Sequence, residues 1–373
     1  MNQLSRRGFA KILGTSAAYA ALNPSLSFST PVLRLMSKAA NATALVRLSS
    51  NENPYGPSPM AVKAMTDAFS LAWRYPDEHE GLLVDALAKL NNVAAPQILL
   101  GNGSGEILKV AAAAFTAAGK KLVVGNPTFE AILAHARTAQ ADVVKIDLTS
   151  DYAHDLAKML DATSDAGLVY ICNPNNPTAS ITPKDQIRAF LAKVPGQTIV
   201  LIDEAYHHYV ESNDYESVIP LVNQYPNLIV ARTFSKIYGM AGLRCGYCVA
   251  RPELVQRMRE QQTWDSLNIM ALVAAAASLQ DAAQVAEGRR RNSEVKQFVY
   301  AELDKLGLKY IPSHANFLMI NLRREVKPMI AAMRARSVEV GRLFPALPNF
   351  MRVTIGTRPQ MDAFVSAFRG VMS

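Results

Sequence analysis

The chain has 373 residues, of which 50% are hydrophobic, and this is enough for two domains with sizeable cores. Its formal net charge of +8 leaves room for a basic pocket that binds an acidic substrate, but the basic residues are scattered apart from three arginines at 289–291. Those three lie in a polar helical stretch and are typical of a solvated helix face. No nucleic-acid-binding motif is present, so we expect small-molecule partners and no nucleic acid.

The N-terminus has the layout of a bacterial export signal. The basic run SRRGFAK at residues 5–11 precedes a mildly apolar stretch, residues 12–22, that is rich in small side chains. The paired arginines resemble the twin-arginine type of signal. The apolar stretch is short for a permanent membrane span. We therefore predict an export signal and leader over residues 1–42, a periplasmic location, and no membrane association of the mature form. A cytoplasmic protein with an uncleaved leader is the alternative.

From about residue 95 onward, short apolar runs alternate with stretches of helical periodicity. The runs are nearly continuous in apolar residues, which is typical of strands that are buried on both faces of a mostly parallel sheet. The predicted strands are residues 121–125, 141–148, 167–172, 198–202, 227–231 and 245–250, and the predicted helices are residues 106–118, 129–138, 183–192 and 252–262. The alternation predicts an α/β fold with helices covering both faces of the sheet.

Cys245 and Cys248, in the last of these strands, have the C-x-x-C spacing of metal and redox sites. Residues i and i+3 of a strand face opposite sides of a sheet, so one metal ion would not easily bind both. Together with Cys172 they make three cysteines, an odd number that gives no disulfide framework. We expect buried thiols and no metal site.

The character of the chain changes after Trp264. An alanine-rich helical region at 270–299 leads to an apolar run at 317–321, a further helix, and a second apolar run at 350–355. This order is typical of a smaller α+β domain. We therefore divide the chain into a leader (1–42), an N-terminal arm with the start of the small domain (43–75), a large domain (76–265) and a small C-terminal domain (266–373).

Three successive predicted strands are followed by polar motifs, which are NPNNPT at 173–178, DEAY at 203–206 and TFSK at 233–236. Ligands of open α/β sheets bind at the carboxyl ends of the strands, so we expect these motifs to meet there. Taken singly, DEAY could bind Mg²⁺ and NPNNPT could be a simple turn. Together they suit pyridoxal phosphate (PLP). Asp203 would keep its ring nitrogen protonated, while Asn176 and Tyr206 would contact its phenolic oxygen. Lys236 would form a Schiff base with its aldehyde and move protons.

The phosphate group of such a cofactor needs hydrogen-bond donors. The motif GNGSGE at 101–106 opens a predicted helix, where free backbone N–H groups attract a dianion, so Ser104 and Gly105 are candidates. Taken alone, this motif is equally typical of a glycine-rich turn. Thr233, Ser235 and Arg244 would add hydroxyl and guanidinium contacts.

In these motifs the chain resembles the class I and II (fold-type I) PLP-dependent aminotransferases, and within them the histidinol-phosphate aminotransferases most of all. The motifs that carry the resemblance are NENPYG at 51–56, GSGE at 103–106, NNPT at 175–178, DEAY at 203–206, TFSK at 233–236, GLRCG at 242–246 and RVTIGT at 352–357. The resemblance implies a fold-type I α/β fold, with a large PLP-binding domain built on a mostly parallel sheet of the seven-stranded type and a smaller α+β domain.

The resemblance also implies roles for individual residues. Lys236 is the Schiff-base lysine and Asp203 is the partner of the pyridine nitrogen. Asn176 and Tyr206 contact the phenolic oxygen. The residues implied to hold the phosphate are Ser104 and Gly105 through their backbone, and Thr233, Ser235 and Arg244 through their side chains.

Further implications concern the substrate and the assembly. Tyr55 would reach the cofactor phosphate of a neighbouring subunit, which implies an obligate homodimer with shared active sites, and it would also lie near the substrate. Arg352 would bind the substrate α-carboxylate, whereas the sequence alone favours a surface arginine. Arg342 lies where an arginine could grip a substrate phosphate, although the surrounding GRLFP at 341–345 departs from the family pattern.

Two departures from the family pattern lie close to the expected cofactor. Phe129 stands where relatives have tyrosine, so it could still stack on the cofactor ring but lacks a hydroxyl; a core aromatic is the alternative. Ala179 stands where relatives have glycine after Asn-Pro-Thr, which would shift that loop slightly.

The expected function is transamination between an amino acid, or a histidinol phosphate-like amine, and a 2-oxo acid. The alternatives on the same scaffold are a PLP-dependent decarboxylase of a phosphorylated amino acid and an aromatic amino-acid aminotransferase. A PLP-binding regulator would normally carry a basic DNA-binding helix-turn-helix, and the short N-terminal extension here is export-like instead. A binding protein without a cofactor is the last alternative.

Overall fold

A seven-stranded sheet forms the centre of the computed structural model, which describes residues 45–372. The strand order is β2-β8-β7-β6-β5-β3-β4. Neighbouring strands from β7 to β4 are parallel, whereas β8 runs antiparallel to both β7 and β2. The strands are β2 (Ile98–Gly101), β3 (Lys121–Asn126), β4 (Val143–Asp147), β5 (Ala166–Cys172), β6 (Ile199–Asp203), β7 (Leu228–Thr233) and β8 (Gly246–Ala250). The predicted mostly parallel sheet is confirmed. The predicted export signal at 1–42 lies outside the described residues.

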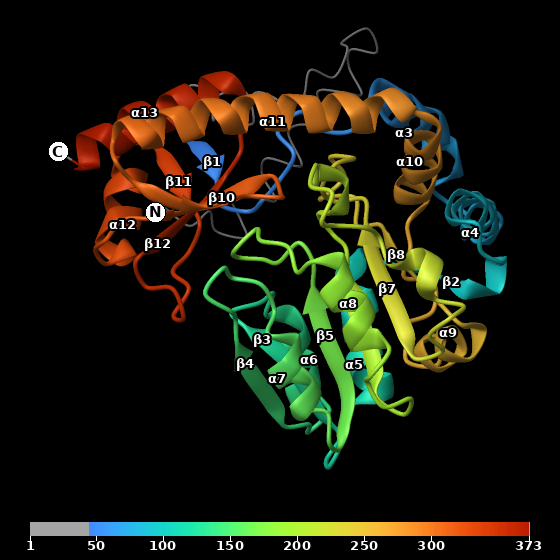
Figure 1. The fold of residues 1–373 in the computed structure, drawn as a ribbon. Coiled ribbons are helices and arrows are strands. Elements are labelled where there is room, and N and C mark those ends of the chain that lie inside the picture. Colours follow the sequence, from blue (N-terminus) through green and yellow to red (C-terminus); the bar gives the residue numbers. More distant parts are fainter. Residues whose placement is uncertain (1–44, 373) are drawn as a thin grey trace, which may run out of the picture. The chain divides into compact units, whose positions relative to one another are not determined.

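Helices cover both faces of this sheet (Figure 1). One face packs against α5 (Ser104–Phe115), α6 (Ala131–Thr138) and α9 (Pro252–Arg259), and the other against α7 (Leu156–Asp161), α8 (Lys184–Leu191) and α10 (Ile269–Gln280). Alternate strand residues enter the two cores, as Leu201 and Ile202 do on β6. Burial on both faces explains why these strands are continuous apolar runs in the sequence.

The predicted alanine-rich helical region at 270–299 is divided in two. Asp281 separates α10 from α11 (Ala282–Lys305), because its φ and ψ of −96° and 77° are not helical. Its side-chain oxygen accepts a hydrogen bond from the backbone N–H of Gln284, which caps the start of α11. The prediction of one helical region was therefore wrong at this residue.

A smaller sheet with its own core lies in the C-terminal part of the chain. Its order is β12-β10-β9, and all of its neighbours are antiparallel. A separate two-stranded pair joins β1 to β11 in parallel. The elements are β1 (Val46–Leu48), β9 (Lys309–Ile311), β10 (Phe317–Asn321), α12 (Val326–Ala335), β11 (Val338–Val340), β12 (Phe350–Thr354) and α13 (Arg358–Met372). In Figure 1, α11 runs from α10, beside the large sheet, across to α13 over the small one. The start of the described chain thus pairs with its C-terminal part.

Three further segments connect β1 to the large sheet. They are α3 (Pro59–Ala68), the short 3-10 helix η2 (Phe69–Leu71) and α4 (Asp77–Asn91). Between residues 45 and 372 no single helix is long and apolar enough to cross a membrane; α10 and α11 meet that test only as a pair, with a bend of 84° between them.

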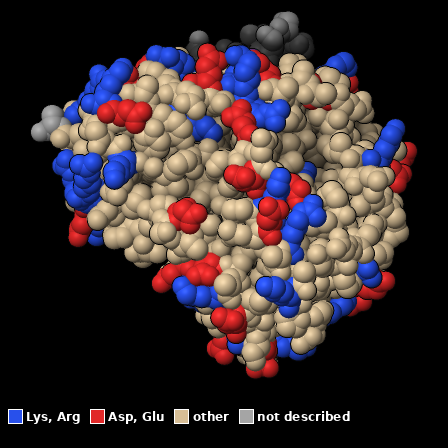
Figure 2. All heavy atoms as spheres, in the orientation of Figure 1, with Lys and Arg blue, Asp and Glu red and all other residues tan. Residues whose placement is uncertain are grey.

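Basic and acidic side chains are interspersed over the face drawn in Figure 2. On α11, Arg290 and Arg291 form ion pairs with Glu287 and keep 62% and 43% of their side chains exposed. The solvated face predicted for the arginine triplet is therefore confirmed. The three cysteines are buried and free, as expected, and burial raises the pKa of Cys248 to about 12.

Candidate active site

The carboxyl ends of β5, β6 and β7 border one cavity of about 690 Å³. Of the residues predicted to form the site, those that line this cavity are Ser104, Gly105, Phe129, Asn176, Asp203, Tyr206, Thr233, Ser235, Lys236, Arg244, Arg342 and Arg352. Tyr55 is the one predicted site residue that does not line it. The arrangement of the parallel strands therefore brings together motifs that are far apart in the sequence.

Lys236 follows the end of β7 and is held by the N-terminal arm. Its Nζ donates a hydrogen bond to the backbone oxygen of Asn51 over 3.1 Å. Burial, with the positive charge of Arg352 as the next cause, lowers the pKa of Lys236 to about 8. A lysine with such a pKa is neutral in a sizeable fraction near pH 7 to 8, as a nucleophilic amine must be.

Asp203 is the last residue of β6 and is almost fully buried. One carboxylate oxygen accepts from the hydroxyl of Tyr170 over 2.9 Å, and the other accepts from the backbone N–H of Ala205 over 3.1 Å. Burial raises the pKa of Asp203 to about 6, and the hydrogen bond from Tyr170 opposes this rise. A cationic ring nitrogen is the kind of partner that stabilises a buried carboxylate, so the site fits a pyridinium group.

Arg352 lies on β12 and is 9% exposed, so the surface position favoured by the sequence alone was wrong. Its Nη1 donates to the side-chain oxygen of Asn176 over 2.8 Å and its Nη2 to the backbone oxygen of Ser49 over 2.6 Å. Its buried Nε has no hydrogen-bond partner. Because its side-chain oxygen accepts from Arg352, Asn176 keeps its amide N–H groups for other partners. A guanidinium that lines the cavity suits a carboxylate ligand.

The first turn of α5 forms a cradle for an anion. The backbone N–H groups of Ser104 and Gly105 begin this 12-residue helix and have no acceptors within it. Gly103 has a φ of +75°, and a Cβ at this position would lie 2.2 Å from Nη2 of Arg244, so only glycine lets the arginine lie across the helix start. Ser235 lines the same cavity. Helix N-terminus, guanidinium and hydroxyl together fit a phosphate.

Thr233 completes this group through its contact with Ser235. The two hydroxyl oxygens lie 2.9 Å apart, and the backbone N–H of Ser235 also donates to the Thr233 hydroxyl oxygen. The turn that carries Ser235 and Lys236 is thereby fixed to the end of β7.

Arg342 and Phe129 lie in the outer wall of the cavity. Arg342 forms an ion pair with Glu130, and its guanidinium lies 4.4 Å from the ring centre of Phe344. About half of the Arg342 side chain is exposed. A substrate anion that binds this guanidinium would therefore compete with Glu130.

Tyr55 lies outside the cavity and is 40% exposed. Arg291 of α11 lies over its ring, with 4.8 Å from the guanidinium carbon to the ring centre. Within one chain, Tyr55 therefore does not contribute to the cavity that contains Lys236.

Several residues that contact the site were not predicted from the sequence. Tyr170 hydrogen-bonds Asp203, and Asn51 contacts both Lys236 and Tyr206. A signal existed for each: Tyr170 is a polar-tipped residue in an otherwise apolar strand, and Asn51 begins the NENPYG motif. No comparable signal identified Arg334 and Glu339, an ion pair from α12 and β11 in the cavity wall.

Known proteins resemble this chain over most of its length. The family "Aminotransferase class I and II" matches residues 43–368. The histidinol-phosphate aminotransferase of Moorella thermoacetica is 39% identical over 333 residues, which are 88% of this chain and 86% of that protein. That of Symbiobacterium thermophilum is 38% identical over 330 residues, 88% of this chain and 91% of that protein.

Solved structures resemble it as well. A histidinol-phosphate aminotransferase from Sinorhizobium meliloti in complex with pyridoxal-5'-phosphate superposes with a TM-score of 0.83 at 26% identity, covering 94% of this chain and 96% of that one. The L-threonine-O-3-phosphate decarboxylase of Porphyromonas gingivalis, 22% identical with a TM-score of 0.76 over 87% of this chain and 98% of that one, shares the fold.

Proposed function

This chain belongs to the class I and II aminotransferases, a PLP-dependent family, and on that premise we propose which of its residues bind the cofactor, move the proton and select the substrate. The observation that carries the proposal is the convergence on one cavity of Lys236, Asp203 and the anion cradle formed by α5 and Arg244. Lys236 suits an aldehyde, Asp203 suits a pyridine nitrogen, and the anion cradle suits a phosphate.

In this proposal Ser104, Gly105 and the guanidinium of Arg244 would hold the cofactor phosphate at the start of α5. Thr233 and Ser235 add hydroxyl donors. Asp203 would pair with the ring nitrogen, Asn176 and Tyr206 would contact the phenolic oxygen, and Phe129 would stack on the ring. Lys236 Nζ would form a Schiff base with the cofactor aldehyde, with the aldehyde oxygen leaving as water.

When bound, PLP stores the electron pair that is released at the substrate α-carbon. Lys236 would accept the proton from the substrate α-carbon and later return it. Its lowered pKa keeps part of the amine neutral and able to accept that proton. Asp203 would stay ionised beside a protonated ring nitrogen and so favour the electron-withdrawing form of the ring. Arg352 orients the substrate through its carboxylate.

We propose a histidinol phosphate-like amine or an α-amino acid as the donor and a 2-oxo acid as the acceptor. The named relatives and the cationic cavity wall with Arg342 and Arg352 support an anionic substrate. Arg342 would bind a distal phosphate or carboxylate after releasing Glu130.

The substrate proposal is tested by mixing the cofactor-loaded protein with a panel of donors that includes histidinol phosphate and aromatic and basic amino acids. We expect single-turnover loss of the lysine-bound cofactor absorbance with histidinol phosphate, and slower loss in Arg342→Gln. If an aromatic amino acid reacts best, the substrate class is wrong. Release of CO₂ without an amino-acceptor product would favour the decarboxylase alternative.

The role of Lys236 is tested by Lys236→Ala. We expect this variant to lose both turnover and the absorbance of the lysine-bound cofactor, because no other amine of the cavity takes its place. Lys63→Ala, on the exposed surface of α3, serves as the control and should retain both. Transamination by Lys236→Ala would contradict the assignment.

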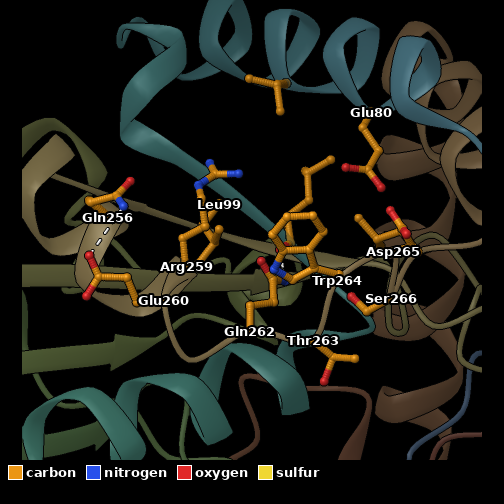
Figure 3. A pocket seen from close by; sticks show the side chains of 13 residues that line it. Glu80, Leu99, Gln256, Arg259, Glu260, Gln262, Thr263, Trp264, Asp265 and Ser266 are labelled. Carbon is orange, nitrogen blue, oxygen red and sulfur yellow. Dashed lines mark hydrogen bonds between the residues drawn. The ribbon is translucent and has the colours of Figure 1, made fainter.

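We further propose a homodimer with shared active sites. Large apolar side chains are exposed along α3, η2, α4 and the segment before α10; they are Tyr55, Met60, Val62, Phe69, Trp73, Tyr75, Leu82, Leu90 and Trp264. Figure 3 shows Trp264 among the side chains of a second hollow, of about 400 Å³, between Glu80 of α4 and the segment from Gln256 to Ser266. Large apolar side chains gathered in neighbouring segments of a protein surface are typical of a protein–protein contact, and we call this set the exposed apolar patch. The position of Tyr55 in this exposed region supports a contact with the cofactor phosphate of a second copy.

Export through the twin-arginine route is also proposed. The SRRGFAK motif supports it, and the family match begins at residue 43, after the predicted leader. The test is to fuse residues 1–44 to a folded reporter and measure its periplasmic fraction. We expect export that is abolished by changing Arg6 and Arg7 to lysine; a reporter that stays in the cytoplasm would favour the uncleaved leader.

A further inference from the structure

Asn51 contacts two of the proposed catalytic side chains at once. Its side-chain amide donates a hydrogen bond to the hydroxyl oxygen of Tyr206 over 3.1 Å. Its backbone oxygen accepts one from Nζ of Lys236, also over 3.1 Å. Asn51 itself is 1% exposed and lines the cavity. Both ends of this residue are therefore committed to groups that would react with or contact the cofactor.

The backbone of Asn51 is in the left-handed region, with a φ of 56°. Asparagine tolerates this conformation better than most residues with a side chain. It is held there by the C-terminal part of the chain: its N–H donates to the hydroxyl of Thr354 over 2.9 Å, and its backbone oxygen also accepts from Asn316 over 3.1 Å. This unusual conformation lets the backbone oxygen and the side-chain amide reach the same cavity.

The polarity of the two hydrogen bonds sets where the reacting groups direct their own protons. Because the Tyr206 oxygen accepts from Asn51, its hydroxyl hydrogen must point elsewhere, and the cavity offers the place of the phenolic oxygen. Because Lys236 donates one N–H to Asn51, the lone pair of its neutral amine is turned away from that carbonyl. We infer that Asn51 is a positioning residue that directs the hydroxyl of Tyr206 and the amine of Lys236 into the cavity, an inference that rests on the roles proposed for these two residues.

The test compares Asn51→Gly with the unchanged protein, both loaded with PLP. Glycine keeps the left-handed backbone and the carbonyl that holds Lys236. It removes the side-chain N–H that orders Tyr206, together with the side-chain oxygen that accepts from the Thr354 hydroxyl over 3.3 Å. The readout is the pH midpoint of the absorbance of the lysine-bound cofactor. A hydroxyl directed at the phenolic oxygen stabilises the deprotonated form, so we expect the midpoint to rise by about 0.5 to 1 pH unit when that direction is lost.

A double-mutant cycle separates positioning from a general structural effect. In the Tyr206→Phe background there is no hydroxyl to direct, so Asn51→Gly should add little further shift. Asn92→Gly is the matched control, because Asn92 also has a left-handed φ, of 52°, but follows α4, outside the cavity. This control should leave the midpoint unchanged.

The inference is overturned if Asn51→Gly leaves the midpoint unchanged, or if it shifts the midpoint equally with Tyr206 and with Phe at that position. If the glycine variant does not retain the cofactor, Asn51→Asp replaces the donor with an acceptor of the same shape. Its shift should again be larger with Tyr206 present, and equal shifts overturn the inference. If the unchanged protein shows no absorbance that depends on Lys236, the proposed function fails, and the inference fails with it.

Discussion

Lys236 and Asp203 line the same cavity, and burial displaces their pKa values in opposite directions. It lowers the pKa of the lysine to about 8 and raises that of the aspartate to about 6. In each case burial favours the neutral form. Both pKa values therefore lie close to 7. Near that pH a lysine must act as a base, and the carboxylate must respond to a cationic ring.

The lysine should destabilise the cofactor-free protein in a pH-dependent way. Its pKa is 10.5 ordinarily and about 8 when folded, so between these values the unfolded chain binds more protons and stability rises with pH. Below about pH 8 the buried ammonium carries its full cost, and Lys236→Met should raise stability there by ~1–3 kcal/mol.

The measurement is thermal unfolding of the cofactor-free protein at pH 6.5 and pH 9.5, values chosen on either side of the folded pKa of about 8. The gain from Lys236→Met should shrink at the higher pH. Lys63→Met, at an exposed lysine on α3, should show no such trend. An equal gain at both pH values would mean that the burial of charge is not the cause.

Tyr170 should contribute to cofactor binding through Asp203. Tyr170→Phe removes the hydroxyl that donates to the carboxylate over 2.9 Å, which raises the pKa of Asp203 further and weakens its interaction with a cationic ring. We expect the Kd of PLP to rise about fivefold to tenfold in an absorbance titration. The control is Tyr300→Phe, because the Tyr300 hydroxyl accepts a hydrogen bond from the backbone N–H of Ser313 and does not line the cavity that contains Asp203. An unchanged Kd for Tyr170→Phe would exclude this role.

At the scale of elements, an ion pair joins the ends of β6 and β7 on the side of the sheet opposite the cavity. Asp203 and Thr233 line the cavity, so their neighbours Glu204 and Arg232 point to the other side. The carboxylate accepts two hydrogen bonds from the guanidinium, over 2.7 and 3.0 Å, and both side chains are buried. The pair fixes the spacing between the strand ends that carry the catalytic side chains.

Glu204→Gln should therefore be strongly destabilising. Removal of one partner leaves the guanidinium of Arg232 buried without a counter-charge, which costs about 3–5 kcal/mol. Urea unfolding measures the loss, and Glu204→Gln combined with Arg232→Gln should recover part of it. Glu287→Gln, in the exposed ion pairs of α11, should move the urea midpoint little. If the buried variant behaves like the exposed one, the ion pair does not brace the strands.

The elements could be predicted where their hydrophobic pattern was local. Strands such as 167–172 were recognisable because burial on both faces made them continuous apolar runs. β2 was missed because only three apolar residues precede the glycine-rich motif, and its pairing with β8 is a tertiary contact. The break at Asp281 was missed because one capping aspartate does not interrupt the composition of an alanine-rich region.

Of the site, only the residues that stand in sequence motifs could be predicted. Residues that face the cofactor directly, such as Lys236 and Asp203, stand in recognisable sequence motifs. Tyr170 and Asn51 act on those residues from other elements, and such partners are set by the packing of strands and loops. The burial of Arg352 likewise depends on β12 pairing with β10, which no local pattern shows.

At the scale of the whole molecule, the exposed apolar patch should determine the oligomeric state. Trp73 and Trp264 are 75% and 90% exposed, so replacing both with arginine should change the folding stability of a single chain little. The same two substitutions should place charge in the proposed dimer contact. We expect sedimentation to show a monomer, and an absorbance titration to show weaker binding of PLP.

Two comparisons make this prediction specific. Leu306→Arg, at a partly exposed leucine at the end of α11 outside the patch, should remain dimeric. Tyr55→Phe should remain dimeric but bind PLP more weakly if Tyr55 reaches the cofactor of the second copy. A monomeric unchanged protein, or a dimer that persists in the double arginine variant, would contradict the proposed assembly.

The arm that holds Lys236 also sets the timing of cofactor capture during protein synthesis. Asn51 and Thr354 are hydrogen-bonded although 303 residues separate them, and Ser49 and Arg352 are separated by the same number. At typical ribosome speeds that interval takes roughly 15 to 60 seconds. The large sheet can form meanwhile, but the arm lacks its hydrogen-bond partners on β12, Arg352 and Thr354, until that strand leaves the ribosome. The cavity is therefore completed only after translation is nearly finished, and a truncated chain that ends before β12 should make the sheet without retaining the cofactor.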